Sequence, residues 1–147
     1  MVDVLTEIQI NRPLEVVSSY AAHPINVPAW YENINYAHRL PEGTTSPLEV
    51  GSLIQFKAAF LGKSLDYTYI ITERSFNKLV MKTNEGPFPM ETIYEWKKID
   101  DQTTHMTLRN RGNPTGFSSL LAPFMSMAMK RANRKDLQKL KSILETP

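Results

Sequence analysis

The fold is decided by residues 64–99, which read SLDYTYIITERSFNKLVMKTNEGPFPMETIYEWKKI. Segments rich in β-branched and aromatic residues cover 64–74, 78–84 and 89–99, and turn-forming residues separate them at Ser75-Phe76-Asn77 and Asn84-Glu85-Gly86-Pro87. Because these connections are short, neighbouring segments must run antiparallel. The stretch therefore predicts an antiparallel meander.

The same pattern continues on both sides of this stretch. Further strands are predicted over 34–40, 51–60 and 103–111, with turn signals between them at Pro41-Glu42-Gly43, Leu61-Gly62-Lys63, Asp100-Asp101 and Gly112-Asn113-Pro114. At the N-terminus, Val2–Asn11 alternates apolar and polar residues with the period of a half-buried strand. Together these segments predict a curved antiparallel sheet of about seven strands.

Helices are expected at two places. A short helix over about 13–22 begins at Pro13 and ends before His23-Pro24, and a second helical turn near Asn26–Tyr31 carries Trp30 and Tyr31. A long helix is expected over 117–145, with Pro123 in its first turns. Its apolar positions are predicted to form one stripe made of Leu121, Phe124, Met125, Ala128, Met129, Ala132, Leu140, Ile143 and Leu144.

The long helix needs an apolar surface to pack against. The inner face of the sheet is the one surface in this pattern large enough, which predicts an α+β, two-layer fold. With 147 residues, the chain is expected to form a single domain over 1–147 with a sizeable core.

Composition excludes several kinds of chemistry. The chain has no cysteine, which rules out disulfides, Cys-based zinc sites, iron–sulfur clusters and thiol nucleophiles. His23, His38 and His105 lack metal-ligand spacing, and no phosphate-binding loop, dinucleotide fingerprint or hydrolase elbow occurs. We therefore expect no metal and no cofactor, and we find no catalytic signature.

Charge and hydropathy favour a cytoplasmic protein. The longest uncharged, apolar-leaning stretch, 117–129, is shorter than the ~20 residues that a membrane span requires, and Met1–Asn11 lacks the features of a secretory signal. Basic residues gather near the C-terminus, at Lys130, Arg131, Arg134, Lys135, Lys139 and Lys141. We interpret them as a solvated helix face and expect no nucleic-acid binding.

Alternation along the strands predicts one aromatic face. Residues at every second position, including Phe56, Tyr67, Tyr69, Tyr94 and Trp96, point the same way. Buried tyrosines seek polar partners, and methionines supply adaptable lining for apolar sites. These features favour a cavity between the sheet and the long helix over a completely filled core.

Five phrases of the sequence are specific enough to compare with known families. They are Ile8-Gln9-Ile10-Asn11-Arg12-Pro13-Leu14-Glu15-Val16-Val17, Asn26 to Trp30, Gly51, Gly86-Pro87-Phe88-Pro89 and Lys135-Asp136-Leu137-Gln138-Lys139-Leu140-Lys141. These phrases resemble the START-like (SRPBCC) superfamily, which includes polyketide cyclase/dehydratase-like and lipid-transport-like proteins. The resemblance covers the whole chain and implies a helix-grip fold, with an apolar ligand between the long helix and the sheet. It assigns no catalytic residue.

Three functions follow from this pattern. The leading hypothesis is a binder or carrier of a small hydrophobic molecule, such as a lipid, polyketide or aromatic metabolite. The alternatives are a cyclase or dehydratase, in which a tyrosine or buried acid moves a proton, and a protein-interaction module. The predicted ligand-binding residues are Trp30, Phe56, Phe60, Tyr67, Tyr69, Met81, Tyr94, Trp96, Met106, Leu108, Leu121, Met125 and Met129.

The character of the interior distinguishes these hypotheses. A buried carboxylate with a shifted pKa, or a histidine, would favour the enzyme. A purely apolar pocket would favour the binder, and a filled core with an apolar outer patch would favour the interaction module.

Overall fold

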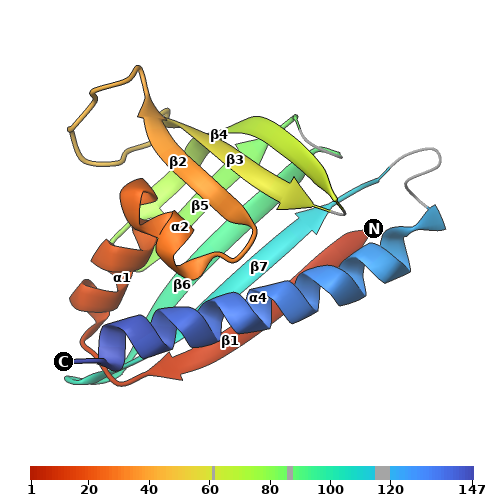
Figure 1. The fold of residues 1–147 in the computed structure, drawn as a ribbon. Coiled ribbons are helices and arrows are strands. Elements are labelled where there is room, and N and C mark those ends of the chain that lie inside the picture. The colour runs from red at the N-terminus through yellow and green to blue at the C-terminus, as the bar shows by residue number, and fades with distance from the viewer. Residues whose placement is uncertain (61, 86–87, 115–119) are drawn as a thin grey trace.

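A computed structural model of the protein describes residues 1–60, 62–85, 88–114 and 120–147. Its strands are β1 (Val2–Ile10), β2 (Ile34–Leu40), β3 (Leu53–Phe60), β4 (Lys63–Ser75), β5 (Lys78–Thr83), β6 (Met90–Asp100) and β7 (Thr103–Gly112). Its helices are α1 (Leu14–Ala22), a 3-10 turn (Pro24–Asn26), α2 (Val27–Trp30) and the long α4 (Ala122–Glu145), as Figure 1 shows. The predicted order of strands and helices is confirmed.

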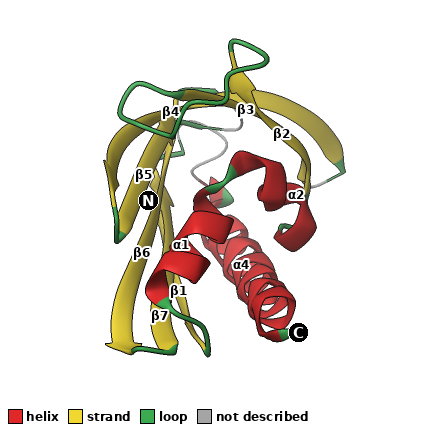
Figure 2. Cartoon of the chain, turned by 90° about the vertical axis from the view of Figure 1, so that its left-hand side faces the viewer, coloured by secondary structure: helices red, strands yellow, loops and turns green. Residues whose placement is uncertain are grey.

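The strands form one antiparallel sheet in the order β1-β7-β6-β5-β4-β3-β2. Strands β2 to β7 follow the predicted meander, while β1 pairs with β7 from Val2 opposite Gly112 to Ile10 opposite Thr104. The sheet curves around α4, and α1 and α2 lie near one end of that helix (Figure 2). The predicted α+β helix-grip architecture is confirmed.

The N-terminal segment is tied to the end of α4. Asn11 donates its backbone N–H to Glu145 Oε2 at 2.7 Å, and Arg12 donates a guanidinium N–H to the Leu144 carbonyl at 2.9 Å. These contacts join the β1–α1 turn to the last turn of α4. They fix which face of the helix meets the sheet.

That face differs from the predicted apolar stripe. The α4 residues buried against the rest of the protein are Ala122, Met125, Asn133, Asp136, Leu137, Leu140 and Leu144. Leu121 and Phe124, which the prediction placed inward, are 40% and 58% exposed. The prediction was wrong for these two residues, whereas Met125, Leu140 and Leu144 are buried as predicted. It assigned inward positions by hydrophobicity and so did not include Asn133 and Asp136, which face inward despite being polar.

Some predictions fall partly outside the described residues. These concern Leu61 and Gly86-Pro87 in two predicted turns, and Phe117–Ser119 at the predicted start of the long helix. The described helix begins at Ala122, and Pro123 lies in its first turn as expected. Among the described residues, no helix has the length and apolar character needed to cross a membrane.

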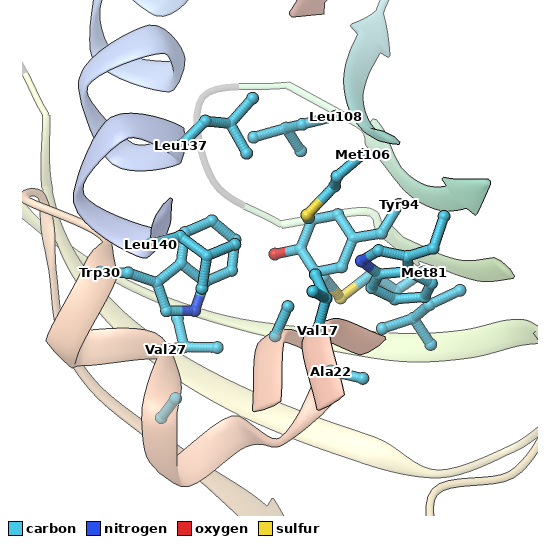
Figure 3. Close-up of a cluster of buried hydrophobic side chains, with 14 of the residues drawn as sticks. Val17, Ala22, Val27, Trp30, Met81, Tyr94, Met106, Leu108, Leu137 and Leu140 are labelled. Atoms are coloured by element: carbon cyan, nitrogen blue, oxygen red, sulfur yellow. The ribbon is translucent and has the colours of Figure 1, made fainter. Parts of the chain in front are cut away.

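Two hydrophobic clusters pack the ends of the layer between helix and sheet. The larger one joins α1, α2 and the C-terminal half of α4 to the sheet, and Figure 3 shows Trp30, Leu137 and Leu140 within it. The smaller one contains Val2, Val4, Phe88, Ala122 and Met125. The middle of α4 lies between the two clusters.

A close backbone approach shapes the smaller cluster. A Cβ atom at Gly112 would lie 2.4 Å from the carbonyl oxygen of Pro89 and 2.8 Å from the ring of Phe88. Only glycine allows this contact. Gly112 therefore lets the Phe88 ring pack closely over the end of β7.

Candidate ligand-binding cavity

A cavity of about 280 Å³ lies between the middle of α4 and the concave face of the sheet. Its size is close to the lower end of small-molecule sites, which span roughly 300–1,000 Å³. Its wall on the sheet comes mainly from β3, β4, β5 and β6, and its wall on the helix is made of Ala128, Met129, Ala132, Asn133 and Asp136.

The helix wall explains why the space is hollow. Ala128 and Ala132 project only a methyl group, whereas one to two turns later Leu137 and Leu140 fill the corresponding space completely. The five wall residues follow the three- and four-residue spacing of one helix face. Short side chains on a continuous face therefore leave room under a sheet that curves over them (Figure 2).

Three aromatic rings form the sheet wall. Phe56 and Tyr69 meet edge to face with ring centroids 5.4 Å apart, and the Tyr67 and Tyr69 rings lie 5.6 Å apart. Such contacts hold the rings in place. Because the rings are tilted against one another, they give the cavity an apolar surface made of both ring faces and ring edges.

Polar groups gather near Tyr31, at the end of the cavity toward α2. The hydroxyl oxygens of Tyr31 and Tyr94 lie 2.6 Å apart and share a hydrogen bond. Burial raises the pKa of both tyrosines, so both remain neutral at physiological pH. The pair therefore has one hydroxyl hydrogen available for a ligand oxygen.

Asp136 is the acidic group on the helix side of the same cavity. Asp136 is almost completely buried, with 3% of its surface exposed. Burial raises the pKa of its carboxyl from the usual 3.8 to about 6. The hydrogen bond that Oδ1 accepts from the Glu32 backbone N–H at 3.0 Å lowers the pKa, but its effect is smaller than that of burial. Both protonation states of Asp136 are therefore accessible near neutral pH.

A second polar group lies one helical turn earlier. Asn133 lines the cavity, and its buried Nδ2 finds no acceptor among the described residues. Across the cavity, Thr92 Oγ1 donates to Asn110 Oδ1 at 2.7 Å and lies 3.5 Å from the Tyr69 hydroxyl. Because buried donors are normally paired, Asn133 is the side chain most in need of a ligand acceptor.

The cavity is partly open to solvent. Exposed residues Asn33, Ala59 and Glu85 contribute to its rim. Glu85 is held in place, since its Oε1 accepts the Thr68 backbone N–H at 2.9 Å. A small molecule can therefore enter at this rim.

The structure separates the predicted ligand-binding residues into groups. The predicted residues that line the cavity are Phe56, Tyr67, Tyr69, Met81, Tyr94 and Met129. Four others, which do not line the cavity, are Trp30, Trp96, Met106 and Leu108. They are packed deeper in the larger cluster, which also contains four of the lining residues. Met125 belongs to the smaller cluster, Leu121 is exposed, and the side chain of Phe60 lies outside the described part of the protein.

The prediction missed the polar lining. It did not select Tyr31, Thr92, Asn110, Asn133 or Asp136 as site residues, although all of them line the cavity. A signal was present on α4, because Asn133 and Asp136 follow Met129 at the spacing of its inward face. Polar residues at such positions mark either an error in the assumed face or a functional site.

The chemistry of the cavity is limited by its side chains. The described residues that line it include two acids, Glu85 at the rim and Asp136, with several hydroxyl and amide groups but no histidine. Within the described part of the chain, no three His, Cys, Asp or Glu side chains are grouped as a metal site. The arrangement can bind a mostly apolar molecule, orient its oxygen atoms and exchange a proton at Asp136.

Solved structures with the same fold come from several bacteria. A protein from Thermus thermophilus aligns with a TM-score of 0.79 at 16% identity, covering 97% of this chain and 96% of that one. The Zhui aromatase/cyclase from Streptomyces sp. R1128 aligns with a TM-score of 0.78 at 15% identity, covering 97% and 93%. A START superfamily protein from Mycobacterium smegmatis gives 0.76 at 12% identity, covering 97% of each chain.

At these identities the structural similarity establishes the fold alone. A comparison with curated proteins finds no match. The model of one family, described as "Polyketide cyclase / dehydrase and lipid transport", matches residues 1–145 and confirms the predicted resemblance. This match spans nearly the whole chain, and the protein therefore belongs to the polyketide cyclase/dehydrase and lipid transport family.

Proposed function

We propose that the cavity binds a small, mostly apolar molecule of the lipid, polyketide or aromatic class, and that Asn133 binds an oxygen atom of this molecule. The observation that carries the proposal is the buried, unpartnered Asn133 Nδ2 on the wall of a cavity otherwise rich in aromatic side chains. A carbonyl or ether oxygen in the ligand would satisfy this donor, while the rings of Phe56, Tyr67 and Tyr69 would cover the ligand's apolar part.

A matched pair of bicyclic probes tests this proposal. 1-Tetralone and tetralin share a carbon skeleton, but only 1-tetralone has a carbonyl oxygen. We expect 1-tetralone to bind more tightly by roughly 2–10-fold, the usual contribution of one neutral hydrogen bond. Calorimetry or ligand-dependent melting measures the difference.

The variant Asn133→Leu removes the donor and keeps the same number and branching of side-chain heavy atoms. It should abolish the preference for 1-tetralone and leave tetralin binding nearly unchanged. A wild-type protein that binds neither probe, or a preference that survives in Asn133→Leu, would contradict the assignment. Native mass spectrometry of the purified protein adds a direct search for a retained ligand.

A second candidate function rests on Asp136. Its carboxyl group lines the cavity with a pKa of about 6, which suits a residue that accepts and returns protons near neutral pH. The neutral hydroxyls of Tyr31 and Tyr94 can stabilise negative charge on a ligand oxygen by donating a hydrogen bond. These groups support a cyclase or dehydratase type of reaction, in which a carbon next to a carbonyl loses a proton.

Hydrogen exchange tests this second function without knowledge of the natural substrate. In D₂O, a base in the cavity should exchange the hydrogens at C2 of 1-tetralone, and proton NMR follows their loss. The exchange rate should rise with pH through about 6 as the Asp136 carboxylate forms, and Asp136→Asn should remove this component. If the bound probe exchanges its C2 hydrogens equally fast in wild type and in Asp136→Asn, the enzyme hypothesis is wrong and a binding function remains.

A further inference from the structure

Exposed apolar side chains cover the first turns of α4 on the face away from the sheet. Met127 is 74% exposed and Phe124 is 58% exposed, and they are joined by Leu121 and by Leu120, which lies just before the helix. Phe124 and Met127 are three residues apart and therefore share one face of the helix. We call Leu120, Leu121, Phe124 and Met127 the α4 apolar patch.

A cluster of cations follows the patch directly along the helix. Lys130, Arg131, Arg134 and Lys135 are all exposed, and residues 120–135 contain no acidic side chain. We call these four residues the α4 basic group. Apolar and basic side chains on adjoining parts of one exposed helix are the combination that attaches proteins to anionic bilayers.

The patch adjoins the cavity. A shallow groove on the outer side of α4 is lined by Phe124, Met127, Arg131 and Lys135, together with Glu32. Ala128 and Ala132 line both this groove and the cavity on the other side of the helix. A surface that contacts the α4 apolar patch would thus lie next to the cavity wall.

We propose that the exposed N-terminal half of α4 attaches the protein to the surface of an anionic lipid bilayer. Phe124 and Met127 would enter the boundary between headgroups and acyl chains, and the α4 basic group would contact lipid phosphate and carboxylate groups. Charge favours this partner over a second copy of the chain. Glu32 is the only acid among the described residues that line the groove or form the patch and the basic group, so a second copy on the same face would mainly bring cations together. The proposal is independent of the cavity ligand, since attachment needs only this surface.

Vesicle co-sedimentation of the full chain tests the attachment. Vesicles of phosphatidylcholine with about three tenths phosphatidylserine should bind the protein, and phosphatidylcholine alone should bind it at least fivefold more weakly. Binding to the mixed vesicles should fall again in about 0.5 M NaCl, because salt screens the attraction. Failure to bind the mixed vesicles at low salt overturns the proposal.

Paired variants locate the contact on α4. Met127→Ser and Lys130→Glu should each weaken binding at least about fivefold. Two matched controls should have little effect. Phe76→Ser replaces an apolar residue in the β4–β5 turn that is about as exposed as Met127, and Lys97→Glu reverses the charge of an exposed lysine on β6. Equal losses in controls and α4 variants would overturn the proposal by showing non-specific adsorption.

Fluorescence reports whether the patch enters the bilayer. Trp30 and Trp96 are buried, so a third tryptophan introduced as Phe124→Trp supplies the solvent-sensitive signal. Its emission should shift to shorter wavelength on mixed vesicles, and an unchanged spectrum with bound vesicles would overturn insertion. Light scattering completes the test by measuring the oligomeric state of the protein. If the wild type is a dimer and Met127→Ser is a monomer, the patch serves self-association and the proposal is wrong.

Discussion

Two regions of the interior, the filled end near α1 and the hollow middle that contains the cavity, share the aromatic face of one sheet. They differ in the α4 residues that face the sheet, which are large leucines at the filled end and small alanines in the middle. At the filled end, Leu137 and Leu140 are almost completely buried against Trp30, Met106 and their neighbours, as Figure 3 shows. In the middle, α4 offers Ala128 and Ala132 to the rings of Tyr67 and Tyr69. The comparison teaches that the helix, through the size of its side chains, decides where the sheet is covered and where a cavity remains.

The comparison extends to polarity. The polar groups of the middle, Asn133 and Asp136, lie on the same helix face as the leucines of the filled end. Buried polar groups cost free energy unless they are paired. Asn133 and Asp136 in the middle of α4 therefore stabilise the fold less than the leucines at the end of the helix do. Polar residues at such inward positions are the pattern expected of a functional site.

The largest expected effect comes from truncating a leucine at the filled end. Leu140→Ala should lower the free energy of unfolding by about 2–5 kcal/mol, because it leaves a cavity in a packed core. Met129→Ala, on the cavity wall, should cost less than about 1.5 kcal/mol, since its side chain already borders open space. Urea denaturation compares the two variants, and equal costs would remove the distinction between the regions.

Enlarging an alanine gives the converse comparison. Ala21 is fully buried in α1 within the larger cluster, so Ala21→Leu should cost about 1–3 kcal/mol through overpacking. Ala132→Leu places the same addition in the cavity and should change the free energy of unfolding by less than about 0.5 kcal/mol. It should also reduce binding of 1-tetralone. A strong destabilisation by Ala132→Leu would mean that the middle is already filled.

Asp136 makes the stability of the middle depend on pH. Its pKa is raised on folding, so the native state holds more protons than the unfolded state between about pH 4 and 6. The free energy of unfolding should therefore fall by roughly 2 kcal/mol across this window as pH rises, and then level off. Comparing the pH dependence of unfolding in wild type and Asp136→Asn checks this, and the variant should lack the decline.

A smaller loss of stability is expected at the polar sheet wall. Thr92→Val keeps the side-chain shape but removes the hydroxyl that donates to Asn110, and should cost about 1 kcal/mol. Thermal unfolding measures this cost. A loss several times larger would indicate that the Thr92–Asn110 pair supports the packed region as well as the cavity.

The architecture was predictable from the sequence because it follows from alternation and turn residues, which act locally. The strands at 34–40 and 78–83, for example, lie where the pattern places them. The aromatic sheet wall was predictable for the same reason, since parity puts Phe56, Tyr67 and Tyr69 on one face.

The boundary between cavity and packed core could not be predicted, because it depends on contacts between distant segments. Trp30 and Trp96 are aromatic like many of the residues that line the cavity, but α1 and the end of α4 pack against them and leave no open space. The inward face of α4 was predicted only in part, because Phe124 is apolar but exposed and Asp136 is charged but buried. The spacing of Asn133 and Asp136 after Met129 places them on the inward face, but their polarity argued against that position.

The pairing of β1 with β7 has a consequence for synthesis of the protein. Val2 lies opposite Gly112, so β1 has to wait for about 110 further residues, or roughly 5–20 s of translation, before its partner strand emerges from the ribosome. The inner face of the growing sheet waits longer still, since its cover, α4, follows β7. During this interval the aromatic rings that later form the cavity wall have no helix packed over them, so the step that completes the fold is also the step that closes the cavity.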